Sequence, residues 1–253
     1  MPTIDINSDL GEGFGSYAMG DDDAILAIVS SANVACGFHA GDPLVMAKTC
    51  ALARKYGVSV GAHPSFPDLQ GFGRRTIPMS DAEIESMVAY QIGALMGIAA
   101  RAGVPVVHVK AHGALYNQAE GDAGVAAALA RAIKAVDPGL VFVAAVGSQM
   151  VAEGERLGLK VAGEAFADRT YTDEGRLVSR KLPGSVLRDA ASARAHVLRM
   201  VGEQALFSLS GKRIPAQIDT LCVHGDEPSA VAVAASVKQA LIEAGITVTA
   251  LTR

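Results

Sequence analysis

Short runs of β-branched and apolar residues alternate with longer Ala- and Leu-rich segments of helical period along the whole sequence. The predicted strands lie within residues 3–10, 32–38, 58–63, 104–113, 140–147, 159–169, 219–226 and 246–251. The predicted helices lie within residues 22–30, 42–57, 80–103, 122–136, 148–158, 189–206 and 228–245. Seven or eight β/α units predict a parallel sheet with helices outside it, either closed into a (β/α) barrel or open and doubly wound.

Capping residues mark the ends of two of these helices. Asp42 suits the N-cap of the helix within 42–57, Pro43 suits its first turn, and Gly57 suits the position after its end. Ser80 and Glu83 form a capping-box pattern at the start of the helix within 80–103. These signals separate the helices from the loops that follow the predicted strands.

Polar side chains at alternate positions of two predicted strands favour the barrel. They are Asp5, Asn7 and Asp9 in the first strand and His108, Lys110 and His112 in the fourth. Because successive side chains of a strand point to opposite faces, each set shares one face. A central strand of a doubly wound sheet is normally apolar on both faces, and buried charges without partners are costly. We therefore expect an α/β fold of the TIM-like barrel type, with a polar lumen.

The bulk composition narrows the class of protein. No linker or charge block divides the 253 residues, so we expect a single (β/α) barrel domain over residues 1–253. A net charge of −4 without a basic stripe argues against nucleic acid as a partner. The N-terminus has no signal-peptide pattern, and apolar runs stay below the roughly 18 residues of a membrane span. Three widely spaced cysteines, Cys36, Cys50 and Cys222, describe no disulfide framework and fit buried thiols in a reducing cytoplasm.

Ionisable residues gather just after the predicted strands, where parallel β/α folds place their reactive groups. They are Asp9, Glu12, His39, Asp42, His63, Asp68, Arg74, Arg75, Lys110, His112, Tyr116, Glu164, Asp168, Arg169, His224 and Asp226. Histidine at such positions is available as an acid, a base or a metal ligand near neutral pH. Asp42 and Asp226 fit helix caps equally well, whereas His196 lies within a predicted helix and is expected on its solvated or half-buried face. We expect most of His39, His63, His112 and His224 to serve one site.

Two common nucleotide-binding motifs are missing. The sequence "GEGFG" differs from the dinucleotide fingerprint, and no Gly-x-x-x-x-Gly-Lys-Ser/Thr motif occurs. Arg74 and Arg75 in "QGFGRR" offer two guanidinium groups suited to a carboxylate or phosphate, although a solvated surface loop fits them equally well.

Six segments in this order resemble the signature segments of the LamB/YcsF family: "DINSDLGEGFG", "SANVACGFHAGDP", "GAHPSFPDLQGFGRR", "VKAHGALYN", "EAFADRTY" and "CVHGDEP". The resemblance runs from about residue 4 to the C-terminus, and Ala111 stands where many relatives are expected to have proline. It implies a barrel related to the glycoside hydrolase/deacetylase group. It also implies a role, together with B and C subunits, in opening the cyclic amide 5-oxo-L-proline to L-glutamate. ATP is then a co-substrate that is cleaved to ADP and phosphate and handled with the partner subunits.

The resemblance assigns no residue roles, so these are hypotheses from side-chain chemistry. Asp9 or Glu12 with His63 would activate water, and Lys110 and His112 would stabilise negative charge or protonate the ring nitrogen. Glu164 completes the candidate catalytic set. Arg169, or the pair Arg74 and Arg75, would hold the substrate carboxylate. The full set of candidate substrate-binding residues is Asn7, His39, Arg74, Arg75, Asp168, Arg169, His224 and Asp226.

Two other functions fit the same residues. A metal-dependent hydrolase or deacetylase acting on another amide would use Asp9, His39, His63 and His224 as ligands of a divalent metal ion. A non-catalytic subunit would instead capture a carboxylated small molecule at the mouth of the barrel for partner enzymes. The sequence alone leaves the presence of a metal open.

Overall fold

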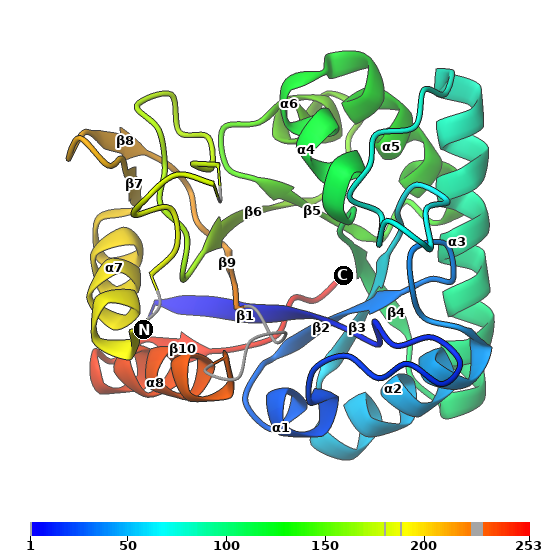
Figure 1. Ribbon diagram of the computed structural model, residues 1–253, viewed down its shortest axis with the longest axis horizontal. Helices are drawn as coiled ribbons and strands as arrows, with labels where there is room; N and C mark the ends of the chain where they lie inside the picture. Colours follow the sequence, from blue (N-terminus) through cyan, green and yellow to red (C-terminus); the bar gives the residue numbers. More distant parts are fainter. Residues whose placement is uncertain (1, 180, 188, 224–229) are drawn as a thin grey trace.

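Parallel strands form a closed ring in the computed structural model, which describes residues 2–179, 181–187, 189–223 and 230–253 (Figure 1). The ring consists of β1 (Thr3–Leu10), β2 (Ser31–Ala35), β3 (Ser59–His63), β4 (Val106–Val109), β5 (Val141–Ala145), β6 (Val161–Phe166) and β9 (Thr220–Cys222). It closes because β9 pairs with β6 on one side and with β1 on the other. An eighth parallel strand, β10 (Thr247–Val248), pairs with the first residues of β1. The predicted TIM-like barrel with seven or eight strands is confirmed.

The lumen of the barrel is polar, as the alternation in β1 and β4 predicts. His108 Nε2 lies 2.8 Å from the side-chain oxygen of Asn33, which lies across the lumen on β2. The amide of Asn33 in turn donates to Asn7 and to Asp9 on β1, at 2.7 Å and 2.9 Å. Thr220 donates to Asp5 deeper in the barrel. These buried side chains thus find partners on other strands, which removes most of the cost of burying them.

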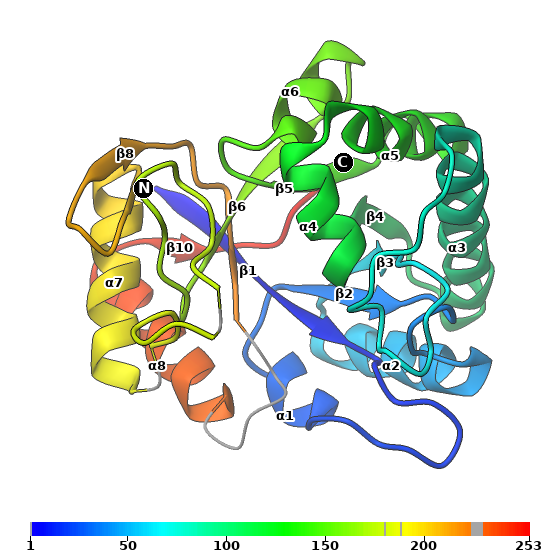
Figure 2. The ribbon, with the colours of Figure 1, turned by 45° about the horizontal axis from the view of Figure 1, so that its top comes forward.

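The apolar core lies outside this lumen, between the strands and the helices that surround them (Figures 1 and 2). These helices are α1 (Asp22–Leu26), α2 (Pro43–Tyr56), α3 (Asp81–Ala102), α4 (Gly113–Gly121), α5 (Ala123–Val136), α6 (Gln149–Arg156), α7 (Ala190–Glu203) and α8 (Ala230–Glu243). Side chains such as Ile92 and Leu95 on α3 and Leu129 and Ile133 on α5 are almost fully buried there. Each such burial contributes about 1.5–3 kcal/mol, so the outer layer stabilises the fold and the lumen is available for polar groups.

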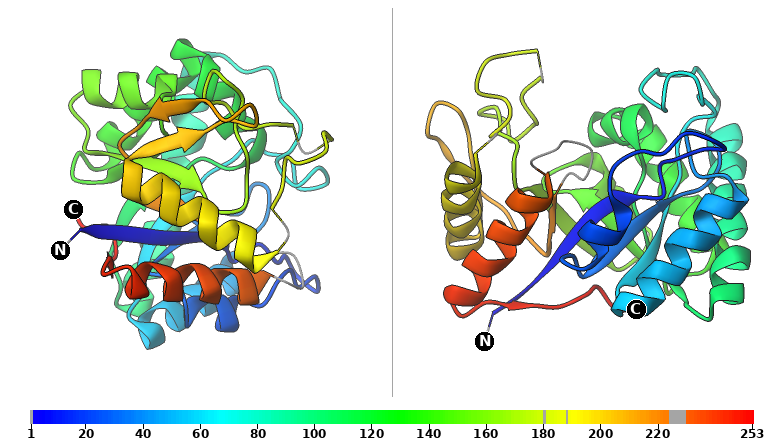
Figure 3. Two further views of the ribbon diagram at one scale, coloured as in Figure 1. Left: turned by 90° about the vertical axis from the view of Figure 1, so that its left-hand side faces the viewer. Right: turned by 60° about the horizontal axis from the view of Figure 1, so that its bottom comes forward.

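The capping signals of two helices are confirmed. Asp42 accepts from the backbone of Leu44 and Val45 at the start of α2, and Gly57 ends that helix in the left-handed conformation. Ser80 and Glu83 form the reciprocal capping box of α3. Figure 3 shows α7 and α8 side by side over another part of the barrel. None of the helices in the described part of the chain is long and apolar enough to cross a bilayer.

The structure adds elements that the sequence did not predict in two segments of the chain. The helix predicted within 189–206 ends at Glu203, and the next residues form β7 (Ala205–Phe207), which pairs antiparallel with β8 (Arg213–Pro215). Tyr116, which we placed at the end of the fourth strand, lies within α4. Gly113 allows this early helix start, because its φ of 58° turns the chain immediately after His112.

A glycine on β3 makes room for the histidine in the lumen. A Cβ at Gly61 would lie 2.1 Å from the ring of His108. We expect Gly61→Ala to lower the free energy of unfolding by about 1–3 kcal/mol, because the buried ring has to shift away from Asn33. Urea denaturation measures this change. Gly97→Ala on an exposed face of α3 is the matched control, since its Cβ meets no neighbour, and it is expected to stabilise by up to about 1 kcal/mol. Equal urea midpoints for Gly61→Ala and the wild type would contradict this packing argument.

Candidate active site

A buried lysine lies between two carboxylates at the C-terminal ends of the strands. Lys110 directly follows β4 in the chain. Its Nζ lies 2.7 Å from Glu164 Oε1 on β6 and 3.0 Å from Asp9 Oδ1 on β1. Tyr116 on α4 donates to the other oxygen of Glu164 at 2.7 Å. Asn7, below them in the lumen, donates to Glu164 and accepts from Lys110. This network holds the ammonium group of Lys110 from several sides.

The charges of this network follow from its geometry. Burial disfavours the ammonium form of Lys110, but the adjacent Asp9 and Glu164 outweigh burial and raise its pKa well above the usual range. Burial likewise opposes ionisation of Asp9, yet His63 and Lys110 hold its pKa well below the usual value. Burial and the neighbouring Glu164 raise the pKa of Tyr116. At neutral pH, Lys110 is therefore a cationic hydrogen-bond donor rather than a base.

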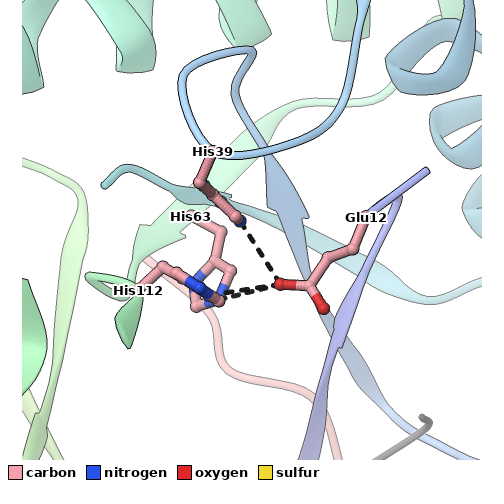
Figure 4. Close-up of side chains that lie close together, drawn as sticks. All are labelled: Glu12, His39, His63 and His112. Carbon is pink, nitrogen blue, oxygen red and sulfur yellow. Dashed lines mark hydrogen bonds and ion pairs between the residues drawn. The ribbon is translucent and has the colours of Figure 1, made fainter. Parts of the chain in front are cut away.

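A second cluster joins one carboxylate to three histidines from three different strand ends (Figure 4). Glu12 Oε1 lies 3.2 Å from His112 Nδ1, 3.3 Å from His39 Nε2 and 3.9 Å from His63 Nε2. The rings of His39 and His112 stack with centroids 3.8 Å apart, and His63 meets both edge-on. The side chains of the three histidines are almost completely buried, and Glu12 is 13% exposed.

Electrostatics within this cluster favour a charged carboxylate on Glu12 and neutral rings of His39 and His112. Burial opposes ionisation of Glu12, but its contacts with His112 and His39 outweigh burial and lower its pKa to about 2. Burial lowers the pKa of His39 to about 3 and also lowers that of His112. Asp9 connects the two clusters, because Oδ1 accepts from Lys110 while Oδ2 lies 3.4 Å from His63 Nε2.

A cavity of about 400 Å³ opens onto both clusters. This volume is typical of small-molecule sites. Its lining contains Asp9, His63, Arg74, Lys110, Ala111, His112, Gly113, Tyr116, Asn117, Glu120, Phe166, Arg169, Arg176, Leu177, Val178 and Ser179. A polar floor and an arginine-bearing rim suit a small, carboxylated molecule.

Sequence reasoning missed part of this lining. Asn117 and Glu120 lie on α4, the helix that was not predicted. Recognising a helix that starts at Gly113 would have placed Glu120 on one face with Tyr116 and with Asn117, because it follows them by four and three residues. Arg176 lies in the segment between β6 and α7. This segment has no helical or strand periodicity from which the position of its side chain could be predicted.

The predicted arginines have different surroundings. Arg74 is exposed and lines the cavity. The side chain of Arg75 instead forms an ion pair with Asp68, whose carboxylate also accepts from the backbone of Gly71 and Arg75. Arg169 is buried at the cavity wall, where its guanidinium donates to the carbonyls of Ser185 and Val178. Arg169 therefore anchors the segment that covers this side of the cavity.

The remaining candidates are placed as follows. Asn7 is fully buried below Lys110 and outside the cavity lining. The backbone carbonyl of Asp168 accepts from Leu187, and its side chain is not part of that lining. Asp42 caps α2 and also accepts from Gly15. His224 and Asp226 lie outside the described residues. Of the four predicted metal ligands, the structure brings His39 and His63 into the histidine cluster and places Asp9 beside it.

The fold and this site define a (β/α) barrel protein of the deacetylase-like architecture, with its polar site at the C-terminal ends of the strands. A solved T48 deacetylase with substrate has the same overall fold at a TM-score of 0.51 and 15% identity, covering 98% of this chain and 88% of that one. The chain belongs to the LamB/YcsF family, which matches residues 4–253. The family expected from the sequence is therefore confirmed.

Two similar proteins extend this comparison over the full length. A protein of Rhodopseudomonas palustris strain BisB5, named as the A subunit of 5-oxoprolinase, is 56% identical over 251 residues, which are 99% of either chain. The crystal structure of a lactam utilization protein from Thermus thermophilus is 45% identical, with a TM-score of 0.94, and the match covers 98% of this chain and 100% of that one.

Proposed function

We propose that the chain is the A subunit of an ATP-dependent 5-oxoprolinase, which opens the lactam ring of 5-oxo-L-proline to give L-glutamate. The observation that carries this proposal is the full-length similarity to the Rhodopseudomonas palustris protein that bears this name. The site supports it, because a fixed ammonium, a carboxylate and arginines meet in one small cavity. The arginines suit the substrate carboxylate, and the ammonium suits negative charge that develops on the lactam.

The chemistry explains why ATP is needed. A lactam is a resonance-stabilised amide, so its carbonyl carbon reacts slowly with water. Transfer of the γ-phosphoryl group to the carbonyl oxygen releases ADP and activates this carbon. Water then adds to it, the ring nitrogen takes a proton, and the carbon–nitrogen bond breaks to leave an acyl phosphate. A second water molecule hydrolyses the acyl phosphate to L-glutamate and phosphate.

The described residues can serve these steps. Asp9 is ionised, 26% exposed and part of the cavity lining, so it is the proposed proton acceptor for the attacking water. Lys110 holds the developing negative charge, while Glu164 and Tyr116 act as positioning residues for its ammonium. Arg74 on the rim, with Arg176, is proposed to bind the substrate carboxylate.

Partner subunits are part of the proposal. The sequence has neither of the two common nucleotide-binding motifs, so we assign ATP handling to the complex with B and C subunits. The free thiols of Cys36, Cys50 and Cys222, all buried, fit a complex that works in the reducing cytoplasm.

A metal-dependent hydrolase acting on another amide is the second candidate. The cluster of Glu12, His39, His63 and His112 favours it, because carboxylate and imidazole are the donors that catalytic zinc sites use. This function predicts hydrolysis of an amide without ATP, whereas the 5-oxoprolinase proposal predicts none. A non-catalytic carboxylate-binding subunit would bind 5-oxo-L-proline and release no product with any partner.

Release of glutamate and phosphate from 5-oxo-L-proline and ATP tests the proposal. The reaction is run with this chain alone, with the B and C subunits alone, and with all three. We expect glutamate only in the complete mixture, and phosphate in equal amount. Phosphate without glutamate in a complex shown to be folded and assembled would contradict the role of this chain in ring opening.

A further inference from the structure

The donor atoms of the histidine cluster have the spacing of a metal site. The side-chain atoms offered by Glu12, His39, His63 and His112 all lie within 4.8 Å of one another. Ligands about 2.0–2.1 Å from a tetrahedral zinc ion lie about 3.3–3.4 Å apart. Glu12 Oε1 lies 3.2 Å from His112 Nδ1 and 3.3 Å from His39 Nε2, and the nitrogens of His112 and His63 are 3.0 Å apart. Glu12 Oε1 and His63 Nε2 are 3.9 Å apart, so the side chains have to close around a small cation for it to contact all four donors.

Backbone carbonyls fix the tautomers of two of the histidines. His63 Nδ1 lies 2.8 Å from the carbonyl oxygen of Lys110, and His112 Nε2 lies 2.9 Å from that of Phe72. A carbonyl oxygen only accepts, so each of these nitrogens carries the ring hydrogen. A neutral imidazole has one such hydrogen, so the neutral forms of His63 and His112 present Nε2 and Nδ1 as bare acceptors.

These two bare nitrogens face each other and the carboxylate of Glu12. Nitrogens 3.0 Å apart with no hydrogen between them repel each other, and Glu12 Oε1 brings a third acceptor within 3.2 Å of His112. A cation between the three turns this repulsion into attraction. Histidine ligands of metals commonly donate their other ring N–H to a backbone carbonyl, which is the arrangement seen here for both rings.

The loop behind His112 is strained in a way that maintains this arrangement. Phe72 has a φ of 55°, a left-handed conformation that is rare for a bulky residue, and it directs its carbonyl to His112. The next residue, Gly73, also has a positive φ, and a Cβ there would lie 2.2 Å from Ser65 and 2.8 Å from the ring of His112. Strain of this kind persists where the surrounding structure requires it, often at functional sites.

We propose that Glu12, His39, His63 and His112 bind one divalent transition-metal ion of the zinc class. Three imidazoles and one carboxylate are donors that zinc accepts in four-coordinate sites. His63 and His112 also line the cavity that contains Lys110, so the ion lies at the edge of the proposed lactam site. Asp9 Oδ2 lies 3.4 Å from His63 Nε2, so a carboxylate that is not one of the four ligands stands beside the proposed ion site.

The structure also ranks the ligands. His63 and His112 each have a carbonyl that fixes the tautomer, whereas His39 Nδ1 has no hydrogen-bond partner in the part of the chain that the structure describes. Outer hydrogen bonds of this kind change metal affinity by about 10- to 100-fold. Loss of His39 should therefore weaken binding less than loss of His63.

Cobalt binding tests the site without any assay of activity. The purified full-length protein is stripped with a chelator, dialysed and titrated with Co²⁺. We expect one Co²⁺ per chain, the intense visible absorption of four-coordinate cobalt, and its disappearance when Zn²⁺ is added. His63→Ala should weaken binding by about 100-fold or more and His39→Ala by about 10-fold. His196→Ala is the control, because this histidine on α7 stacks on Tyr171 outside the cluster, and it should bind Co²⁺ as the wild type does.

The wild-type measurement decides independently of whether the variants fold. A stripped and folded wild type that takes up neither Co²⁺ nor Zn²⁺ at a hundredfold molar excess would overturn the proposal. Equal cobalt affinity in the wild type and in a folded His63→Ala variant would also overturn it. Because these readouts do not involve the partner subunits, they remain valid whether or not the chain acts on 5-oxo-L-proline.

Discussion

Lys110→Met is expected to reduce glutamate formation by the assembled complex by about 10²- to 10³-fold, the effect of removing one donor that stabilises transition-state charge. It is also expected to lower the free energy of unfolding by about 3–5 kcal/mol. Methionine fills a similar volume but leaves the buried Glu164 and the partly buried Asp9 without their cation. Glutamate release at saturating substrate and urea denaturation measure the two effects.

A double variant separates the two effects. Lys110→Met with Glu164→Gln removes one positive and one negative charge, and the glutamine still accepts from Tyr116. We expect it to recover part of the lost stability, because fewer charges remain buried without a partner. The activity should stay low, because the ammonium is still missing. If activity returned together with stability, Lys110 would have a structural role only.

The polar lumen was predictable because a strand leaves its side chains little freedom of direction. Alternation along β1 and β4 was enough to place Asn7, Asp9 and His108 inside the barrel. Asn33 on β2 follows the same rule two residues after Ser31, and the sequence could have identified it in this way. The closure of the barrel through β9 depends on pairing between segments far apart in the sequence, and no local pattern determines it.

The division of the site into two clusters was not predictable. Asp9 and Glu12 stand three residues apart, yet one contacts Lys110 and the other contacts the histidines. The chain turns between them at Gly11, whose φ is 67°. Residue types indicated that acids, bases and possible ligands collect at the strand ends. Only the backbone path after each strand decides which of them meet, and for His224 and Asp226 the sequence prediction remains a prediction.

The adjacent arginines of "QGFGRR" provide a test of substrate recognition. Arg74→Gln is expected to raise the KM for 5-oxo-L-proline and to lower kcat/KM by roughly 10- to 150-fold, because a hydrogen bond to a charged group contributes about 1.5–3 kcal/mol. Kinetics of the assembled complex with varied 5-oxo-L-proline measure this change. A lactam without the carboxylate should be a poor substrate for the wild type. Its kcat/KM should also differ less between the wild type and Arg74→Gln than that of 5-oxo-L-proline does.

Arg75→Gln is the matched control, since it removes the same charge one residue further along the same loop. In the wild type, the guanidinium of Arg75 forms an ion pair with Asp68. After the substitution, the backbone N–H groups of residues 71 and 75 still donate to the carboxylate of Asp68. The loop should therefore keep its path, and kcat/KM should change by less than about threefold, because Arg75 does not line the cavity and the buried carboxylate of Asp68 keeps its backbone donors. Equal losses of kcat/KM in the two variants would mean that the total positive charge of the loop, and not a contact of Arg74, determines substrate binding. A loss confined to Arg74 would place the substrate carboxylate at the cavity rim, on the side of the histidine cluster, because Arg74 lies over the ring of Phe72, whose carbonyl binds His112.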